Sequence, residues 1–197
     1  MSMTASHYLE GQILIAMPGI GDPRFDRSLI FVCAHSKSGA MGIIVNKTAP
    51  MMFFSDLVDQ LKIVPSDEIR ELAPPVLNLP VLFGGPVEQF RGFVLHSTDY
   101  LSNATSLPIN DTVALTATVE ILQAIARGNG PIKVMLALGY SGWVAGQLEN
   151  EIQHNGWLHC EADDDLIFGP DNDGKYGRAL KKIGVDPLML SSESGHA

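Results

Sequence analysis

The stretch Leu14–Lys47, LIAMPGIGDPRFDRSLIFVCAHSKSGAMGIIVNK, indicates how this chain folds. It holds two short apolar runs, Ser28–His35 and Met41–Asn46, whose Ile and Val content is typical of strands. Because only a short polar turn separates them, the two runs are predicted to form an antiparallel hairpin. A further strand is predicted over Gln12–Met17, where another apolar run stops at a Pro-Gly pair.

Later segments combine strands with helices. The nearly all-apolar run Ile132–Leu138 is typical of a central strand buried on both faces. Short strands are predicted over Val81–Phe83 and Gly92–His96, and helices over Ala117–Arg127, from Ser141 or Gly142 onward, and over Tyr176–Ile183. Hairpins together with strand–helix–strand units favour a mixed sheet over a purely parallel one.

The composition predicts one folded domain in the cytoplasm. With 197 residues, 46% of them hydrophobic and 18% charged, the chain is long enough for one substantial core, and we predict a single domain over residues 1–190. The polar residues 191–197 are predicted to form a disordered tail. No secretory signal or membrane-spanning run is expected. The two cysteines, Cys33 and Cys160, form no CxxC motif, which favours free thiols in a reducing compartment.

The charge of the chain argues against nucleic acid as a partner. The formal net charge is −9, and the 13 Lys and Arg residues are scattered, with one adjacent pair at Lys181-Lys182. Proteins bind duplex DNA chiefly by neutralising phosphates with Lys and Arg. Direct DNA binding is therefore not expected.

Three polar motifs, two of which contain glycine, occur at predicted strand ends, and we expect them to meet in one cleft. They are Asp22–Ser28, Gly84–His96 and Tyr140–Gln147. Arg27 and Arg91 would suit a phosphate or carboxylate, and a glycine-rich turn that opens a helix offers further N–H donors. The cleft would bind a small anionic ligand or a partner peptide through Asp22, Arg27, His35, Arg91, His96, Tyr140, Ser141, Gly142, Trp143 and Gln147. The alternative is that the two arginines pair with Asp22, Asp26 or Glu88 and only fix loops.

No motif in the sequence predicts catalysis, a metal or a cofactor. The segment around Ser141 resembles the G-x-S-x-G nucleophile elbow, but Trp143 replaces the final glycine, so Ser141 is expected to be a turn or N-cap residue. The histidines lack metal-ligand spacing, although His35 and His96 end strands that could be neighbours. An enzyme, perhaps a hydrolase that uses His35, His96 or Glu149 as acid or base, is the first alternative function.

Four segments carry a family resemblance. They are the opening stretch, LFGGPVEQFRGFVLHS (Leu82–Ser97), LALGYSGWVAGQLENEIQHNGWL (Leu136–Leu158) and the C-terminal RALKKIGVDP. The chain closely resembles the AlgH/YqgE family of bacterial proteins over nearly its whole length. It departs from the family at Ser141, where alanine is usual, and near Tyr176, where a tryptophan is often found.

The resemblance implies a fold but little about function. It implies an α+β domain whose mixed, mostly antiparallel sheet curls into a half-barrel with flanking helices. Family members have no defined activity, and some carry the label of transcriptional regulator without a DNA-binding motif. Our leading interpretation is a non-enzymatic regulatory or accessory protein, with the enzyme and the transcriptional regulator as alternatives.

Overall fold

The computed structural model describes residues 8–65, 68, 72 and 74–190. The strands are β1 (Gln12–Ala16), β2 (Leu29–Ser36), β3 (Gly39–Ile44), β4 (Thr48–Phe53), β5 (Pro80–Phe83), β6 (Val87–Ser97), β7 (Ser106–Pro108), β8 (Val113–Thr116), β9 (Val134–Val144) and β10 (Trp157–Glu161). The helices are α1 (Phe54–Gln60), α2 (Pro74–Leu77), α3 (Val119–Ala126), α4 (Gln147–Gln153), α5 (Asp164–Phe168) and α6 (Asn172–Lys182). Short 3-10 helices cover Pro23–Phe25 and Pro187–Leu190.

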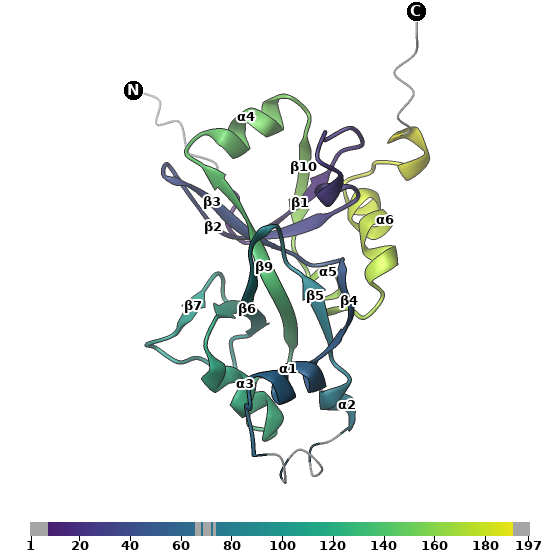
Figure 1. Ribbon diagram of the computed structural model, residues 1–197. Helices are drawn as coiled ribbons and strands as arrows, with labels where there is room; N and C mark the ends of the chain where they lie inside the picture. Colours follow the sequence, from purple (N-terminus) through teal and green to yellow (C-terminus); the bar gives the residue numbers. More distant parts are fainter. Residues whose placement is uncertain (1–7, 66–67, 69–71, 73, 191–197) are drawn as a thin grey trace, which may run out of the picture.

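Within the described residues, ten strands join in one sheet. Its order is β10-β1-β2-β3-β9-β6-β8-β7, and β5 lies between β9 and β4. The pairing of β5 with β9 is parallel, whereas β2 and β3 form the antiparallel hairpin predicted from the sequence. Figure 1 shows the sheet curling into a half-barrel flanked by helices. The predicted α+β fold with a mixed, mostly antiparallel sheet is therefore confirmed.

The sheet is organised around β9. The first half of β9 pairs with β5, where Val81 lies opposite Leu136, and the second half pairs with β3, where Gly42 lies opposite Ser141. β6 pairs with β9 over much of its length. One strand therefore connects the part of the sheet that carries α4 with the part that carries α1 and α3, as Figure 1 shows.

The prediction that a helix begins at Ser141 or Gly142 is wrong. β9 continues to Val144, and α4 begins only at Gln147, after Gly146 in the left-handed region. The segment stays extended because β3 pairs with it from Ser141 to Val144, so backbone groups of this segment find partners in a neighbouring strand rather than in a helix. The candidates Tyr140, Ser141, Gly142 and Trp143 therefore belong to strand β9 and not to the start of a helix.

The core consists of three apolar clusters, and β9 contributes to each of them. Ala137 belongs to a cluster with α5 and α6, and Leu136 belongs to a second cluster beneath α1 and α3. Trp143 belongs to the third, which includes Leu148 of α4 and Trp157 of β10. The alternation along β9 sends neighbouring side chains to different clusters, as the pleat of a strand requires.

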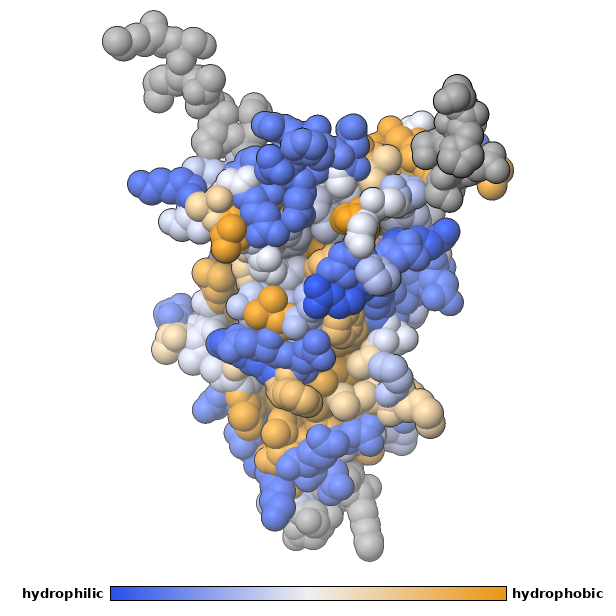
Figure 2. Space-filling view, turned by 45° about the horizontal axis from the view of Figure 1, so that its top comes forward, coloured by the Kyte–Doolittle hydropathy of each residue, from blue (hydrophilic) through white to orange (hydrophobic). Residues whose placement is uncertain are grey.

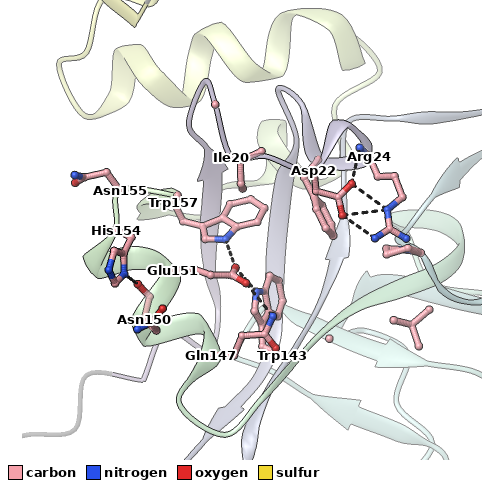
Figure 3. Close-up of a pocket in the computed structure, with 16 residues that line it drawn as sticks. Ile20, Asp22, Arg24, Trp143, Gln147, Asn150, Glu151, His154, Asn155 and Trp157 are labelled. Carbon is pink, nitrogen blue, oxygen red and sulfur yellow. Dashed lines mark hydrogen bonds and ion pairs between the residues drawn. The ribbon is translucent and has the colours of Figure 1, made fainter. Parts of the chain in front are cut away.

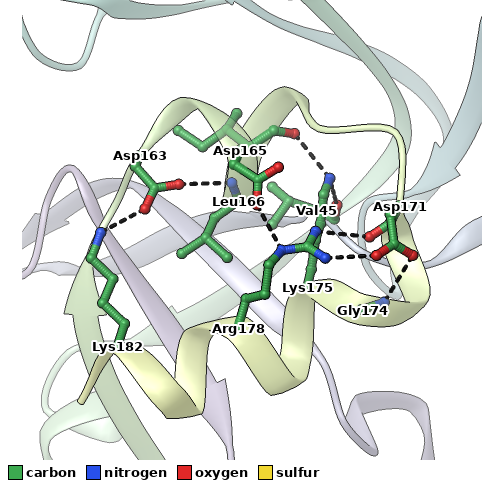
Figure 4. A network of polar contacts seen from close by, with 10 residues as sticks. Val45, Asp163, Asp165, Leu166, Asp171, Gly174, Lys175, Arg178 and Lys182 are labelled. Atoms are coloured by element: carbon green, nitrogen blue, oxygen red, sulfur yellow. Dashed lines mark hydrogen bonds and ion pairs between the residues drawn. The ribbon is translucent and has the colours of Figure 1, made fainter. Parts of the chain in front are cut away.

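A buried lysine anchors α6 (Figure 4). Lys175 donates hydrogen bonds from Nζ to the carbonyl oxygens of Val45 at 2.8 Å and of Ile167 at 3.2 Å. Burial lowers the pKa of Lys175 to about 8. On the surface nearby, Arg178 contacts the carboxylate of Asp171 at 2.6 Å. These contacts hold α6 against α5 and the segment that follows β3.

The two thiols are buried. Cys33 and Cys160 are both free, as the sequence predicted, and burial raises the pKa of each thiol. The tail predicted for residues 191–197 lies outside the described residues. Among the residues that are described, no helix is both long enough and apolar enough to cross a membrane.

Candidate functional site

A cavity of about 490 Å³ lies where the loop before β2, the start of β6, the end of β9 and α4 meet. Each of the three motifs singled out in the sequence contributes to it, through Asp22, Val87 and Gln147 among others. We call this cavity the cleft, and Figure 3 shows it from close by. Its lining residues are Gly19, Ile20, Asp22, Arg24, Phe25, Pro86, Val87, Gly142, Trp143, Gln147, Asn150, Glu151, His154, Asn155, Gly156 and Trp157.

Glu151 is the centre of the polar contacts in the cleft. Its Oε2 accepts hydrogen bonds from the indole Nε1 of Trp143 and from that of Trp157, each at 2.8 Å. Its Oε1 accepts a third from Nε2 of Gln147 at 2.9 Å. Figure 3 shows both indoles directed at this carboxylate. Three donors from α4, β9 and β10 therefore fix one carboxylate in place.

Aromatic rings pack against the two indoles that donate to Glu151. The rings of Trp143 and Trp157 meet edge to face with centroids 5.9 Å apart, and Phe25 meets Trp157 in the same manner at 5.7 Å. Trp157 is only 2% exposed. Edge-to-face packing of buried rings stabilises their orientation, so the two N–H donors are held in position.

Glu151 was not among the ten candidate site residues of the sequence analysis. Gln147 was among the candidates, and Glu151 follows it at i+4, the spacing that places two residues on one helix face. That spacing was the available signal. The contact with Trp157 was not visible, because nothing local shows that the strand after α4 turns this indole back toward the helix.

Asp22 and Arg24 form an ion pair at the opposite wall. Arg24 donates from Nη2 to the Asp22 carboxylate at 2.7 Å and from Nε to both of its oxygens at 3.0 and 3.1 Å. The backbone N–H of Arg24 adds a bond to the same carboxylate, which caps the 3-10 helix. The Arg24 side chain holds the pKa of Asp22 below its usual value. The charge of this guanidinium is therefore already balanced.

Arg27 and Arg91 do not meet in the cleft. The guanidinium of Arg27 lies over the ring of Tyr176, with 4.9 Å from Cζ to the centroid. Arg91 donates to Glu88 at 3.2 Å and lies over the ring of Phe93. The anion site expected from two converging arginines is therefore not formed, and for Arg91 the pairing with Glu88 is the alternative that the sequence left open.

His35 and His96 lie far apart. Through β3, His35 is in register with Trp143 near the end of β9, whereas His96 faces Val134 at its beginning. Nine residues of strand separate these positions, roughly 30 Å at the rise of an extended chain. The two-histidine site considered from the sequence is thereby excluded. Among the residues that the structure describes, no group of three His, Cys, Asp or Glu side chains is placed to hold a metal ion.

Both histidine rings use both nitrogens within the fold. Nδ1 of His35 accepts from the backbone N–H of Leu9 at 2.9 Å, so Nε2 carries the proton and donates to Glu149 at 3.1 Å. In His96, Nδ1–H donates to the carbonyl of the next residue, and Nε2 accepts from the hydroxyl of Thr116 at 2.8 Å. Neither ring keeps a free nitrogen for transferring a proton to a substrate.

The remaining candidates lie in or beside β9. Ser141 is completely buried within the strand, so it is neither the expected N-cap nor an accessible nucleophile. Tyr140 packs edge to face on Phe93 and lines a shallow hollow next to the cleft, together with Arg91. Of the ten candidates, the cleft lining includes Asp22, Gly142, Trp143 and Gln147.

Comparison with known proteins identifies the family. A family model described as AlgH-like, DUF179, matches residues 13–188. This chain belongs to the AlgH-like family. A UPF0301 protein of Bradyrhizobium diazoefficiens is 60% identical over 98% of this chain and 91% of its own length. A UPF0301 protein of Methylobacterium nodulans is 58% identical over 98% and 92%. The family assignment made from the sequence motifs is confirmed.

Solved structures show the same fold. The solution structure of AlgH from Pseudomonas aeruginosa is 35% identical, covers both chains completely and superposes with a TM-score of 0.77. A crystal structure of a protein from Corynebacterium diphtheriae covers 95% of this chain and 92% of its own, with 18% identity and a TM-score of 0.66. At that identity the likeness concerns the fold alone. This chain and AlgH therefore share the half-barrel.

Proposed function

We propose that this AlgH-like protein is a regulatory or accessory binding protein, and that its cleft binds a positively charged group of a small molecule or partner peptide. The arrangement of Glu151 carries the proposal. An ionised carboxylate offers about four accepting positions, and the three donors from Trp143, Trp157 and Gln147 occupy three of them. One accepting position remains, on a carboxylate that is already held still.

The charges around the cleft support a cation rather than the anion expected from the sequence. Of the described lining residues, Arg24 is the single Lys or Arg, and Asp22 already balances its charge. Glu151 then leaves the lining with a negative charge.

The outer rim of the cleft adds acceptors. His154 donates from Nδ1 to the carbonyl oxygen of Asn150 at 2.8 Å, so a neutral imidazole presents Nε2 as an acceptor. Both residues line the cleft, and Figure 3 places them on the side of α4 away from Trp143. An ammonium or guanidinium group has several N–H donors and suits such a set of acceptors.

Titration with a matched set of five-carbon compounds tests the proposal. Cadaverine has two ammonium groups, glutarate has two carboxylates, and 1,5-pentanediol is uncharged. The two tryptophans of the chain both line the cleft, so their fluorescence reports on its occupancy. We expect a saturable change with cadaverine and none with the other two. Tighter binding of glutarate, or no saturable change with cadaverine up to roughly 10 mM, would overturn the proposal.

Two glutamates of one helix provide the matched variants. Glu151→Gln removes the charge in the cleft, whereas Glu149→Gln alters a side chain that contacts His35 and does not line the cleft. Loss of a charged hydrogen bond weakens binding about tenfold or more, so we expect this loss for Glu151→Gln and little change for Glu149→Gln. Circular dichroism verifies that both variants are folded. Equal affinity of the two variants would exclude Glu151 as the binding group.

A further inference from the structure

The two oxygens of the Glu151 carboxylate are used to different extents. Oε2 accepts from the indoles of Trp143 and Trp157, each at 2.8 Å, whereas Oε1 accepts from Gln147 at 2.9 Å. Each oxygen of an ionised carboxylate offers about two accepting positions. With respect to the described residues, Oε2 is therefore full, and Oε1 has one position left for a ligand.

The donors that create this inequality are held in place. Trp143 is 7% exposed and Trp157 is 2% exposed, and the two rings pack edge to face. The amide of Gln147 is fixed at its other end, because its Oε1 accepts from the backbone N–H of Val144 at 3.0 Å. To open a second position on Oε2, a ligand would have to turn a packed indole away from the carboxylate.

Organic cations differ in the accepting positions that they need. A guanidinium holds its N–H groups in a rigid planar fork, and it binds a carboxylate best by donating to both oxygens at once. A primary ammonium is a compact charge with three N–H donors on a flexible stem, so one donor can reach a single position while the others keep different partners. A quaternary ammonium has the same charge but no N–H donor. The Glu151 carboxylate, with one position on one oxygen, suits the primary ammonium.

The wall of the cleft leaves water within reach of the other two N–H donors. Gln147, Asn150 and His154 of the α4 region line the cleft and are exposed. Figure 2 shows hydrophilic residues gathered over the upper part of the molecule, where Figure 1 places α4. An ammonium group is strongly hydrated, so a site that takes one N–H and leaves the others wet removes little of that hydration.

We propose that the cleft selects a primary ammonium group over a guanidinium, and that the indoles of Trp143 and Trp157 set this selectivity by filling Oε2 of Glu151. This inference rests on the function proposed for the cleft, and it names primary amines as the class of ligand. A guanidinium placed at Oε1 directs its second N–H at Oε2, where two N–H groups already point. It keeps one hydrogen bond instead of two, and its charge lies against those two donors.

Three cations with the same four-carbon chain test the proposal. Butylammonium, butylguanidinium and butyltrimethylammonium are titrated against the full chain at pH 7, with tryptophan fluorescence as the signal. We expect butylammonium to bind about tenfold or more tightly than either of the others. Butylguanidinium or butyltrimethylammonium binding as tightly as butylammonium would overturn the selectivity and leave the cation site standing. No saturable change with any of the three would also overturn the selectivity, and the same result with cadaverine would overturn the proposed function itself.

Variants show whether the selectivity depends on Oε2. Trp143→Phe keeps a ring but removes its N–H donor, and Trp157→Phe does the same from β10, so either change leaves one position open on each oxygen. The remaining indole still reports on the cleft, and circular dichroism verifies the fold. We expect the tenfold preference for butylammonium over butylguanidinium to be lost or reversed in each variant.

Gln147→Met is the matched control for these two changes. It opens a second position on Oε1 and leaves Oε2 full, so the preference for butylammonium should persist even if the affinities change. An undiminished preference in the folded tryptophan variants would overturn the role assigned to the indoles. Equal loss of the preference in Gln147→Met would overturn it as well, because the selectivity would then not depend on which oxygen is filled.

Discussion

A second hollow, which we call the groove, lies between α1, α3, β6 and β9. The cleft and the groove use different parts of the same strand, yet they are built in opposite ways. At the end of β9, Trp143 is buried and its N–H donates to Glu151, so the cleft consists of side chains that already have partners. In the first half of β9, Leu136 and Leu138 line the groove, whose rim residue Phe90 is fully exposed. The cleft is therefore part of the packed core, whereas the groove has an exposed apolar rim.

Because of this difference, changes in the two hollows are expected to affect the free energy of unfolding to different extents. Changes in the cleft remove packed rings or leave buried donors without acceptors, so they are expected to lower the free energy of unfolding as well as affinity. Changes at the rim of the groove remove side chains that pack on little, so they should leave the free energy of unfolding nearly unchanged. Four measurements test this contrast, and they are given in order of decreasing expected effect.

The largest effect is expected for Trp157→Ala. Trp157 is 2% exposed, packs on Phe25 and Trp143, and donates to Glu151. Truncation of a buried tryptophan costs about 3–5 kcal/mol, which we expect to see in urea unfolding followed by circular dichroism. Trp157→Phe keeps a ring and should cost less. A loss below about 1 kcal/mol for Trp157→Ala would show that the cleft is not part of the packed core.

Lys175 extends the comparison to a polar group buried beneath α6. Its pKa is lowered by burial from 10.5 to about 8. Between these pH values the unfolded chain holds a proton that the folded chain has released, so stability should rise as the pH increases from 8 to 10.5 and stay level with respect to this group below 8. The full difference amounts to about 3 kcal/mol, at 1.36 kcal/mol per pKa unit.

Comparison with Lys175→Met isolates this contribution from the other groups that titrate at high pH. The difference in unfolding free energy between the wild-type protein and Lys175→Met should increase across the interval from pH 8 to 10.5. Lys181→Met is the control, because Lys181 is exposed on the same helix. The same pH dependence in both variants would show that Lys175 does not titrate differently in the folded protein.

An intermediate effect is expected for Glu151→Gln. The amide oxygen can still accept from the indoles, but the amide nitrogen cannot accept from Gln147, whose Oε1 is already bound to the N–H of Val144. One bond and the charge assistance of the others are lost, which costs about 1–2 kcal/mol. Glu10→Gln alters an exposed glutamate and should have no measurable effect. Thermal unfolding that is identical for the two variants would contradict the contact map of the cleft.

The smallest effect is expected for Phe90→Ser. Its side chain is 99% exposed, so its removal should change the free energy of unfolding by less than about 0.5 kcal/mol. Urea unfolding of this variant beside Trp157→Ala gives the contrast between groove and cleft in one experiment. A loss of 2 kcal/mol or more, on the order of a buried side chain, would mean that Phe90 packs against the protein in solution.

The sequence by itself determined the β2–β3 hairpin, the family and the free state of the two cysteines. Short Ile- and Val-rich runs gave the hairpin of β2 and β3, because a strand pattern with a short turn has few other solutions. The long ungapped motifs identified the AlgH-like family and, with it, the half-barrel. The free thiols of Cys33 and Cys160 followed from their number and spacing.

Only the tertiary structure decided how the candidate residues are used. The segment through Ser141 has a glycine content that suits a turn, but β3 pairs with it from Ser141 onward and β6 pairs with Tyr140 just before it, so it stays extended. Arg91 pairs with a carboxylate three residues away rather than with a ligand. Glu151 becomes the centre of the cleft because β9 and β10 bring two distant indoles to it. Strand pairing and side-chain partners depend on residues far apart in the chain, and a local pattern contains no record of them.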